Sequence, residues 1–345
     1  MSEDRPGLLD GAIWPAENTK LFGHEEAEDF LAQFYRSGKG HHAILIEGPE
    51  GIGKATLAFR FANHVLSHPD PASAPLRIGD PDLNSAVSRQ ITAGASHNLL
   101  HLSRPVDEKT GKVKSAITVD EVRRAGKFFS QTSGTGNWRI VIIDPADDMN
   151  RNAANAILKI LEEPPKRAMF LVLSHAPGKL LPTIRSRCLP LKLAPLDDQA
   201  LVSALAHLGI QSVGQGEEQA LLSAAKGSVG EALKLLNYGG GDIIEAYNAV
   251  LSSEGPAARK AMHRLADALS GKESDTIFDF FVSHVGDDVM NRARIAAGEG
   301  RIAAAERLAR LYSDITEKLT VSDAYNLDRK QTIMEVLSDI KQPRA

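Results

Sequence analysis

The pattern of hydrophobic and polar residues divides the chain into two regions, and the first occupies about residues 1–195. Short apolar runs of strand length are separated there by segments whose apolar residues recur at helical spacing. The runs are "HHAILIEG", "LLHLSRP", "RIVIID", "AMFLVLS" and "LPLKLAPL". Alternation of this kind predicts an α/β domain with a mostly parallel sheet covered by helices on both faces.

Four helices are predicted from apolar spacing and end signals, one before the first run and three between later runs. The fourth, "NRNAANAILKILEEPP", is halted by paired prolines. Residues 68–98 are rich in Pro, Ser, Asp and Gly, and we predict an irregular segment there. Of the other three helices, the first begins near Ala27 and stops at Gly38, and the second extends from Lys54 to about Leu66. The third starts at Thr118, where Glu121 completes a capping box.

The second region begins at about Asp197. From there the apolar residues have helical spacing, with breaks at "HLGIQSVGQG", "KGSVG" and "NYGGGD". The triple glycine at 239–241 is the best linker candidate. We therefore predict an α/β domain at 1–195, a small helical domain at 196–238 and a final helical domain at 242–345. In the last, "GEGRIAAAERLARLYSDITEKL" has the broad apolar stripe that helix packing needs.

Composition narrows the class of protein without giving a function. Hydrophobic residues make up 43% of the chain, which is enough for buried cores. Aromatic residues make up only 5%, while Ala and Leu recur throughout, which favours helix-rich α/β architecture. No apolar run reaches about 20 residues and "MSEDRPGLLDG" has no signal-peptide features, so we expect a cytoplasmic protein without membrane contact. The net charge of −4 gives no global reason to bind nucleic acid. Cys188 is the only cysteine and is predicted to be a packing residue.

The stretch "LIEGPEGIGKATLAF" contains most of a phosphate-binding loop, between a predicted strand and a predicted helix. Gly48, Gly51 and Gly53 would let backbone amides turn towards phosphate oxygens, and the positive end of the helix adds to their attraction. Lys54 would reach the β- and γ-phosphates. These residues, with the neighbouring Ala55, Thr56 and Asp144, are the predicted nucleotide-binding positions.

Three positions depart from what ATP hydrolysis needs. Ala55 stands where a Ser or Thr hydroxyl would bind Mg²⁺, and Thr56 is rotated by about 100 degrees on the helix and cannot replace it. Asp144 ends its strand and could hold a metal through water, but Pro145 follows where many ATPases carry an activating glutamate. Gly230 occupies the place of an arginine that often reports on the γ-phosphate. We therefore expect any ATP or ADP in the loop to be bound without hydrolysis, and we assign no metal ligands.

The segments "RNAANAILKILEEPP" and "FLVLSHAPGKLLPTIRSRC", at their mutual spacing, resemble bacterial clamp-loader subunits of the AAA+ class. The resemblance is strong over about residues 21–236. It implies an AAA+ P-loop domain, a helical lid domain at 196–238 and a helical collar domain at 242–345. It also implies a place in the hetero-pentameric clamp loader of the DNA polymerase III holoenzyme, beside gamma or tau motor subunits and a delta subunit. That assembly loads a sliding clamp onto primed DNA.

Within this family the defective site resembles that of the stator subunit, which has no ATPase activity of its own. The resemblance implies that Arg187, in "SRC", reaches the ATP of a neighbouring motor subunit as an arginine finger. Ser174 and His175 fall at the family's first sensor position, and Ser174 joins the predicted nucleotide-binding residues. Asp147 and Asp148 are interpreted as solvated turn and helix-cap residues.

Related subunits often carry a four-cysteine zinc module after the loop helix, in the region that corresponds to residues 68–98. This segment has no cysteine, and its two histidines, His68 and His97, are too few for a closed site. We therefore expect no zinc.

Two other functions remain as alternatives. A motor subunit would need Mg²⁺ despite Ala55 and an activating carboxylate despite Pro145. A small-molecule kinase is disfavoured because "LEEPP" and "SRC" have no place in such an enzyme. Contact with DNA has three candidates, each explained equally well as a solvated surface charge: Arg151, Lys159 and Lys166.

Overall fold

The structure is a computed structural model, and it divides into two compact units, Met1–Leu233 and Lys234–Ala345. Among the residues that it describes, no helix is both long and apolar enough to cross a bilayer. The described residues are 7–38, 41–107, 110–111, 113–130, 136–210, 221–237, 239–271, 275–325 and 327–341.

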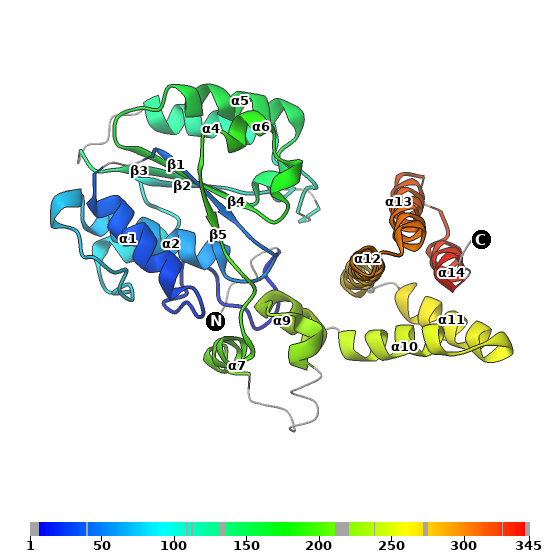
Figure 1. The fold of residues 1–345 in the computed structure, drawn as a ribbon. Coiled ribbons are helices and arrows are strands. Elements are labelled where there is room, and N and C mark those ends of the chain that lie inside the picture. Colours follow the sequence, from blue (N-terminus) through cyan, green and yellow to red (C-terminus); the bar gives the residue numbers. More distant parts are fainter. Residues whose placement is uncertain are drawn as a thin grey trace. The chain divides into compact units, whose positions relative to one another are not determined.

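The first unit is built on a five-stranded sheet whose strands all run parallel (Figure 1). The strand order is β2-β3-β4-β1-β5, so the carboxyl ends of β3, β4 and β1 lie next to one another at one edge. The predicted strands are confirmed, because each apolar run contains one of them. Their bounds are β1 Ala43–Glu47, β2 Leu99–Leu102, β3 Arg139–Ile143, β4 Ala168–Ser174 and β5 Leu189–Lys192.

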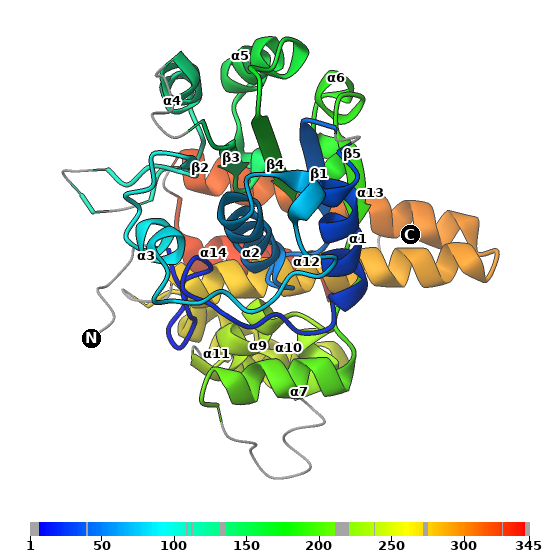
Figure 2. The same ribbon diagram turned by 90° about the vertical axis from the view of Figure 1, so that its left-hand side faces the viewer.

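Helices cover both faces of this sheet, as predicted (Figures 1 and 2). Successive strand residues point to opposite faces, so Ile44 and Ile46 pack on one side while Ala43 and Leu45 pack on the other. The inner strands β1, β3 and β4 are buried on both faces and are therefore mostly apolar. The first face is covered by α1 Glu25–Arg36, α2 Lys54–Ser67 and α3 Ala86–Thr92, and the second by α4 Val119–Ser130, α5 Arg151–Glu162 and α6 Pro182–Arg185.

Helix α3 lies inside the segment 68–98, where the prediction of an irregular chain was wrong. Its start is fixed by Ser85, whose hydroxyl oxygen accepts a hydrogen bond from the Ser88 amide at 3.1 Å. Ile91 is 5% exposed and packs in the same core as α2. A helix of 7 residues has too few apolar repeats to outweigh the Pro, Asp and Gly around it.

The first unit ends in helices, in agreement with the helical spacing predicted from about Asp197 onward. The Asp197 carboxylate caps α7 (Asp198–His207). The break predicted at "KGSVG" is confirmed: Gly227 has a φ of 76°, and an added Cβ would lie 2.3 Å from the Leu196 carbonyl oxygen. Helix α9 (Val229–Asn237) follows, and the boundary between the two units falls within it. The break predicted at "HLGIQSVGQG" lies largely outside the described residues, and the division of this unit into α/β and lid domains stays a prediction.

The second unit is helical where the structure describes it, as predicted for the final domain. Tyr247 and Phe281 pack edge to face in its core, with ring centroids 6.1 Å apart. The triple glycine does not form the predicted linker, because Gly240 and Gly241 belong to the first turn of α10, after a left-handed Gly239. The helices are α10 Gly240–Ser252, α11 Gly255–Leu269, α12 Asp275–Gly298, α13 Ile302–Ala324 and α14 Arg329–Lys341.

Candidate nucleotide site and arginine finger

The predicted phosphate loop connects β1 to α2. Gly51 and Gly53 have φ values of 74° and 104°, in the left-handed region that favours glycine. Gly48 is required for space, because an added Cβ would lie 2.7 Å from the Leu193 carbonyl oxygen. The loop therefore has the glycine geometry of an anion cradle.

The hydrogen bonds of this loop fix which way its backbone groups point. The amides of residues 51–53 have no hydrogen-bond partner within the described part of the chain, so they remain available to phosphate oxygens. Every carbonyl oxygen of residues 48–53, in contrast, accepts a hydrogen bond. The donors are the Lys54 ammonium to Gly48 (2.7 Å) and Pro49, Ser228 Oγ to Glu50 (2.8 Å), the Gly230 amide to Gly51 (3.1 Å), His24 Nε2 to Ile52 (2.8 Å) and the Leu57 amide to Gly53 (3.0 Å).

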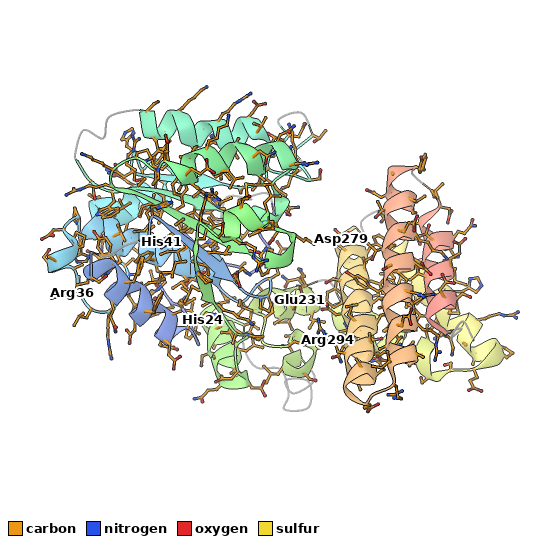
Figure 3. All side chains as sticks on the ribbon, turned by 45° about the horizontal axis from the view of Figure 1, so that its top comes forward. His24, Arg36, His41, Glu231, Asp279 and Arg294 are labelled. Atoms are coloured by element: carbon orange, nitrogen blue, oxygen red, sulfur yellow. The ribbon has the colours of Figure 1, made fainter. Side chains whose placement is uncertain are left out.

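Two of these donors, His24 and Ser228, were not found from the sequence. His24 stands at the beginning of α1 (Figure 3), is 6% exposed, and burial lowers its pKa, so the imidazole is neutral and carries its proton on Nε2. Ser228 is 5% exposed, and its hydroxyl oxygen also accepts the Glu231 amide at 3.1 Å. The Ser-x-x-Glu spacing of a capping box was the signal that could have found Ser228.

Lys54 is almost fully enclosed at the centre of the loop, with 4% of its surface exposed. Burial lowers the pKa of its ammonium to about 8, against the opposing attraction of Asp144, Glu50 and Asp147. The lysine is thus charged at neutral pH, and the surrounding carboxylates compensate only part of its desolvation.

Lys54 should make stability depend on pH. Because its folded-state pKa lies below the usual 10.5, the unfolded chain binds one more proton between pH 8 and 10.5, and stability rises with pH across this window. We expect the free energy of unfolding of the wild type to gain up to about 3 kcal/mol over the Lys54→Met variant in this interval. Urea titrations of both proteins at several pH values measure the difference, and parallel curves would contradict the prediction.

The metal side of the site offers no hydroxyl at the expected position. Ala55 packs against the core beneath α2, and Thr56 is itself buried, with 7% of its surface exposed. Asp144 directly follows β3, with its Oδ2 at 3.6 Å from His101 Nε2, and the peptide bond to Pro145 is cis. Within the described ranges, no group of three or more His, Cys, Asp or Glu side chains could hold a metal ion.

Asp147 is not the solvated turn residue that we predicted. Its Oδ1 accepts a hydrogen bond from the Ser174 hydroxyl at 2.8 Å, and its Oδ2 accepts the amides of His175 at 2.5 Å and Ala176 at 3.3 Å. Ser174 is fully buried at the end of β4. The carboxylate therefore holds the loop that follows β4, and the Ser174 hydroxyl is already engaged by it.

Two further side chains lie beside this carboxylate. Nδ1 of His175 is buried without a hydrogen-bond partner among the described residues, and burial, followed by the charge of Lys54, lowers its pKa. Asp148, also interpreted as solvated, is half-buried and pairs with Arg104 at 3.1 Å. Burial raises the pKa of Asp148, and Arg104 opposes this shift.

Gly230 lies directly on the phosphate loop. An added Cβ would lie 2.9 Å from the Gly51 Cα, and a Cβ on Gly51 would lie 2.5 Å from Ser228 Oγ and 2.8 Å from the Gly230 Cα. Contact at these distances is possible only between two glycines. An arginine at position 230 would require the loop and α9 to move apart.

Substitution of Gly230 by alanine should destabilise the protein although alanine favours helices. Overpacking against backbone costs about 1–3 kcal/mol, more than the gain of about 1 kcal/mol in helix propensity. Gly126→Ala is the matched control, because Gly126 is also helical but an added Cβ meets nothing within 4 Å. We expect Gly230→Ala to lower the urea midpoint and Gly126→Ala to raise it. Equal shifts would show that α9 can move away from the loop at little cost in free energy.

Arg187 lies two residues before β5, near the amino ends of the strands, whereas the phosphate loop follows their carboxyl ends. Because β1 and β5 are parallel, with Glu47 beside Lys192, the loop follows the carboxyl ends while Arg187 precedes an amino end. The side chain is 33% exposed. Its neighbour Cys188 is 6% exposed, and burial raises the thiol pKa to about 12, as suits a packing residue. Arg187 is therefore out of reach of this chain's own loop.

The three candidates for DNA contact are exposed. Arg151 begins α5, Lys159 lies on its outer side and Lys166 precedes β4. Exposure suits DNA contact and solvated charges equally, so these residues stay candidates.

A parallel sheet ordered β5-β1-β4-β3-β2, with a phosphate loop after β1 and an aspartate after β3, defines a P-loop α/β protein. The family described as "DNA polymerase III, delta subunit" matches residues 23–197, about half of the chain. The chain belongs to this family.

Similar proteins include DNA polymerase III subunits of two kinds. The chain is 39% identical over 147 residues to subunit delta' of Pseudomonas aeruginosa, covering 43% of this chain and 41% of that one. It is 30% identical over 208 residues to subunit delta' of Escherichia coli (59% and 57%), and 27% identical over 289 residues to subunit tau of the same species (83% and 41%). The chain thus spans about half the length of these relatives.

One solved structure with a similar fold is a gamma subunit-related protein of DNA polymerase III from Thermotoga maritima. It has a TM-score of 0.45 and 19% sequence identity, and the match covers 91% of this chain and 99% of that one.

Proposed function

We propose that this chain is a clamp-loader subunit of DNA polymerase III that acts as a stator: it has no ATPase activity of its own and supplies Arg187 to the ATP site of a neighbouring motor subunit. The observation that carries the proposal is the contact of Gly230 with Gly51, which leaves no room for the γ-phosphate arginine. Ala55 and Pro145 remove the metal-binding hydroxyl and the water-activating carboxylate from the same site.

The position of Arg187 supports action on another subunit. It lies near the amino ends of the strands, away from the loop at their carboxyl ends, and its side chain is on the surface and long enough to cross an interface. A guanidinium supplied in trans stabilises charge on the transferring phosphoryl group and makes hydrolysis depend on assembly.

The proposed partners are gamma or tau motor subunits and a delta subunit in a hetero-pentamer, with the sliding clamp and primed DNA bound by the assembly. The helical second unit would serve as the collar. The test is to mix the chain with purified gamma or tau and delta subunits and to measure the mass of the product. A chain that remains monomeric in that mixture would contradict the proposal.

The loop fits the phosphates of ATP or ADP but not a bound Mg²⁺ ion. The free amides of residues 51–53 and the Lys54 ammonium would hold the phosphates, whereas Ala55 offers no ligand for the metal. We propose that any bound nucleotide is held weakly and nearly independently of Mg²⁺. Calorimetric titration with and without Mg²⁺ tests this, and a tenfold gain from the metal, about 1.4 kcal/mol, would show that another group has replaced the missing ligand.

The isolated chain should not hydrolyse ATP, since metal, water-activating and sensor groups are all absent from its site. A phosphate-release assay on the purified chain measures this directly. Turnover near 1 per second that is lost in the Lys54→Ala variant would refute the stator role.

A motor subunit is the second candidate, favoured by the intact cradle around Lys54 and by the 27% identity to subunit tau over 83% of the chain. The same assay separates the two functions, because only a motor would hydrolyse ATP by itself.

A further inference from the structure

Arg187 is held in place by two acceptors from two different helices. Its Nη2 donates to Oε1 of Glu162, the last residue of α5, at 2.7 Å. Its Nη1 donates to the Thr183 carbonyl oxygen of α6 at 2.9 Å. A guanidinium has five N–H donors in a rigid plane, so two hydrogen bonds fix its orientation and leave three donors for a phosphate.

The backbones that carry this pair are anchored in one hydrophobic core. Leu161, which precedes Glu162, is 1% exposed, and Arg187 lies between Ile184 at 1% and Cys188 at 6%. The carboxyl end of α5 also favours a nearby cation. The backbones at Glu162 and Arg187 are therefore fixed by packing, and only the two charged side chains can change conformation.

Stability alone does not explain this ion pair. The side chains of Arg187 and Glu162 are 33% and 49% exposed, and ion pairs with such access to water add little to folding. Orientation of a reacting group, in contrast, can change a rate by orders of magnitude.

We infer that Glu162 is a positioning residue, which holds the guanidinium of Arg187 ready for the phosphate of the neighbouring subunit. This inference rests on the proposed function. A free arginine samples many rotamers, and the ion pair with Glu162 selects one of them before the subunits meet.

The test uses the reconstituted loader with clamp and primed DNA and follows a single turnover of ATP. Arg187→Ala should remove one kinetic phase, that of the adjacent site. Glu162→Ala should slow the same phase about tenfold, with the KM for ATP unchanged. Glu162→Gln, which keeps an acceptor oxygen, should slow it less. Glu163→Gln is the matched control, an exposed carboxylate one residue further along, and should leave the phase unchanged.

The double variant separates positioning from an independent role. If Glu162 acts through Arg187, Glu162→Ala should have no further effect in the Arg187→Ala background. A further effect there, or a wild-type phase in Glu162→Ala alone, would overturn the inference while the arginine finger stands. If Arg187→Ala itself changes no phase, the finger and the inference fail together.

Discussion

Replacement of Arg187 by alanine should leave the clamp-loader assembly intact and slow ATP hydrolysis at one neighbouring site by about 10³- to 10⁵-fold, the effect of arginine fingers in well-studied phosphoryl-transfer systems. Total steady-state turnover should fall only in part, because other sites keep their own fingers, unless firing is concerted. Assembly should survive because the proposed collar, and not this loop, holds the subunits together.

Two substitutions control this experiment. Arg187→Lys should rescue poorly, because an ammonium cannot reproduce the planar fork of a guanidinium. Arg185→Ala removes an exposed arginine two residues away and should leave hydrolysis unchanged. If the Arg187→Ala complex formed normally and loaded clamps at the wild-type rate, Arg187 would be a structural charge.

Replacement of Glu28 by alanine should be the most destabilising of the changes considered. Its Oε1 lies 2.6 Å from Nε of Arg60, with side-chain exposures of 11% and 4%. Burial raises the pKa of Glu28, against the hydrogen bond and charge of Arg60. Removing one member of a buried pair costs about 3–5 kcal/mol, and the lower end applies here because Asp80 still contacts Arg60 at 3.1 Å.

The neighbouring carboxylate provides the control. Asp29 on the same helix lies 3.6 Å from Arg77, whose side chain is 83% exposed, and such a surface pair contributes about 0–1 kcal/mol. Urea unfolding of Glu28→Ala and Asp29→Ala should give clearly different midpoints. Equal midpoints would mean that the guanidinium of Arg60 reaches water when its partner is removed.

Most of the fold could be predicted because a parallel sheet leaves a strong local signal. Strands such as Ala43–Glu47 are buried on both faces and read as continuous apolar runs. The phosphate loop could be predicted for the same reason, since its glycines and Lys54 lie within seven residues of one another. Helix α3 escaped because it is short and capped only by Ser85.

The parts of the site that escaped prediction depend on contacts between distant segments. Ser228 and Glu50 are 178 positions apart, and Asp147 and Ser174 are 27 apart. Asp147 was misread because a carboxylate after a strand resembles a solvated turn until the amides at the end of β4 are seen to surround it. The spacing of neighbouring residues in the sequence does not predict such hydrogen bonds between distant segments.

The contact between Gly51 and Gly230 also bears on how such a site could change. A variant with serine at position 55 and glutamate at position 145 would still lack the arginine, and that third substitution meets the Gly51 backbone. The three changes are thus not equivalent, because the last requires α9 to move away from the phosphate loop. A designer who aims at ATP hydrolysis would therefore have to rebuild the packing of α9 on the phosphate loop before adding the other two groups.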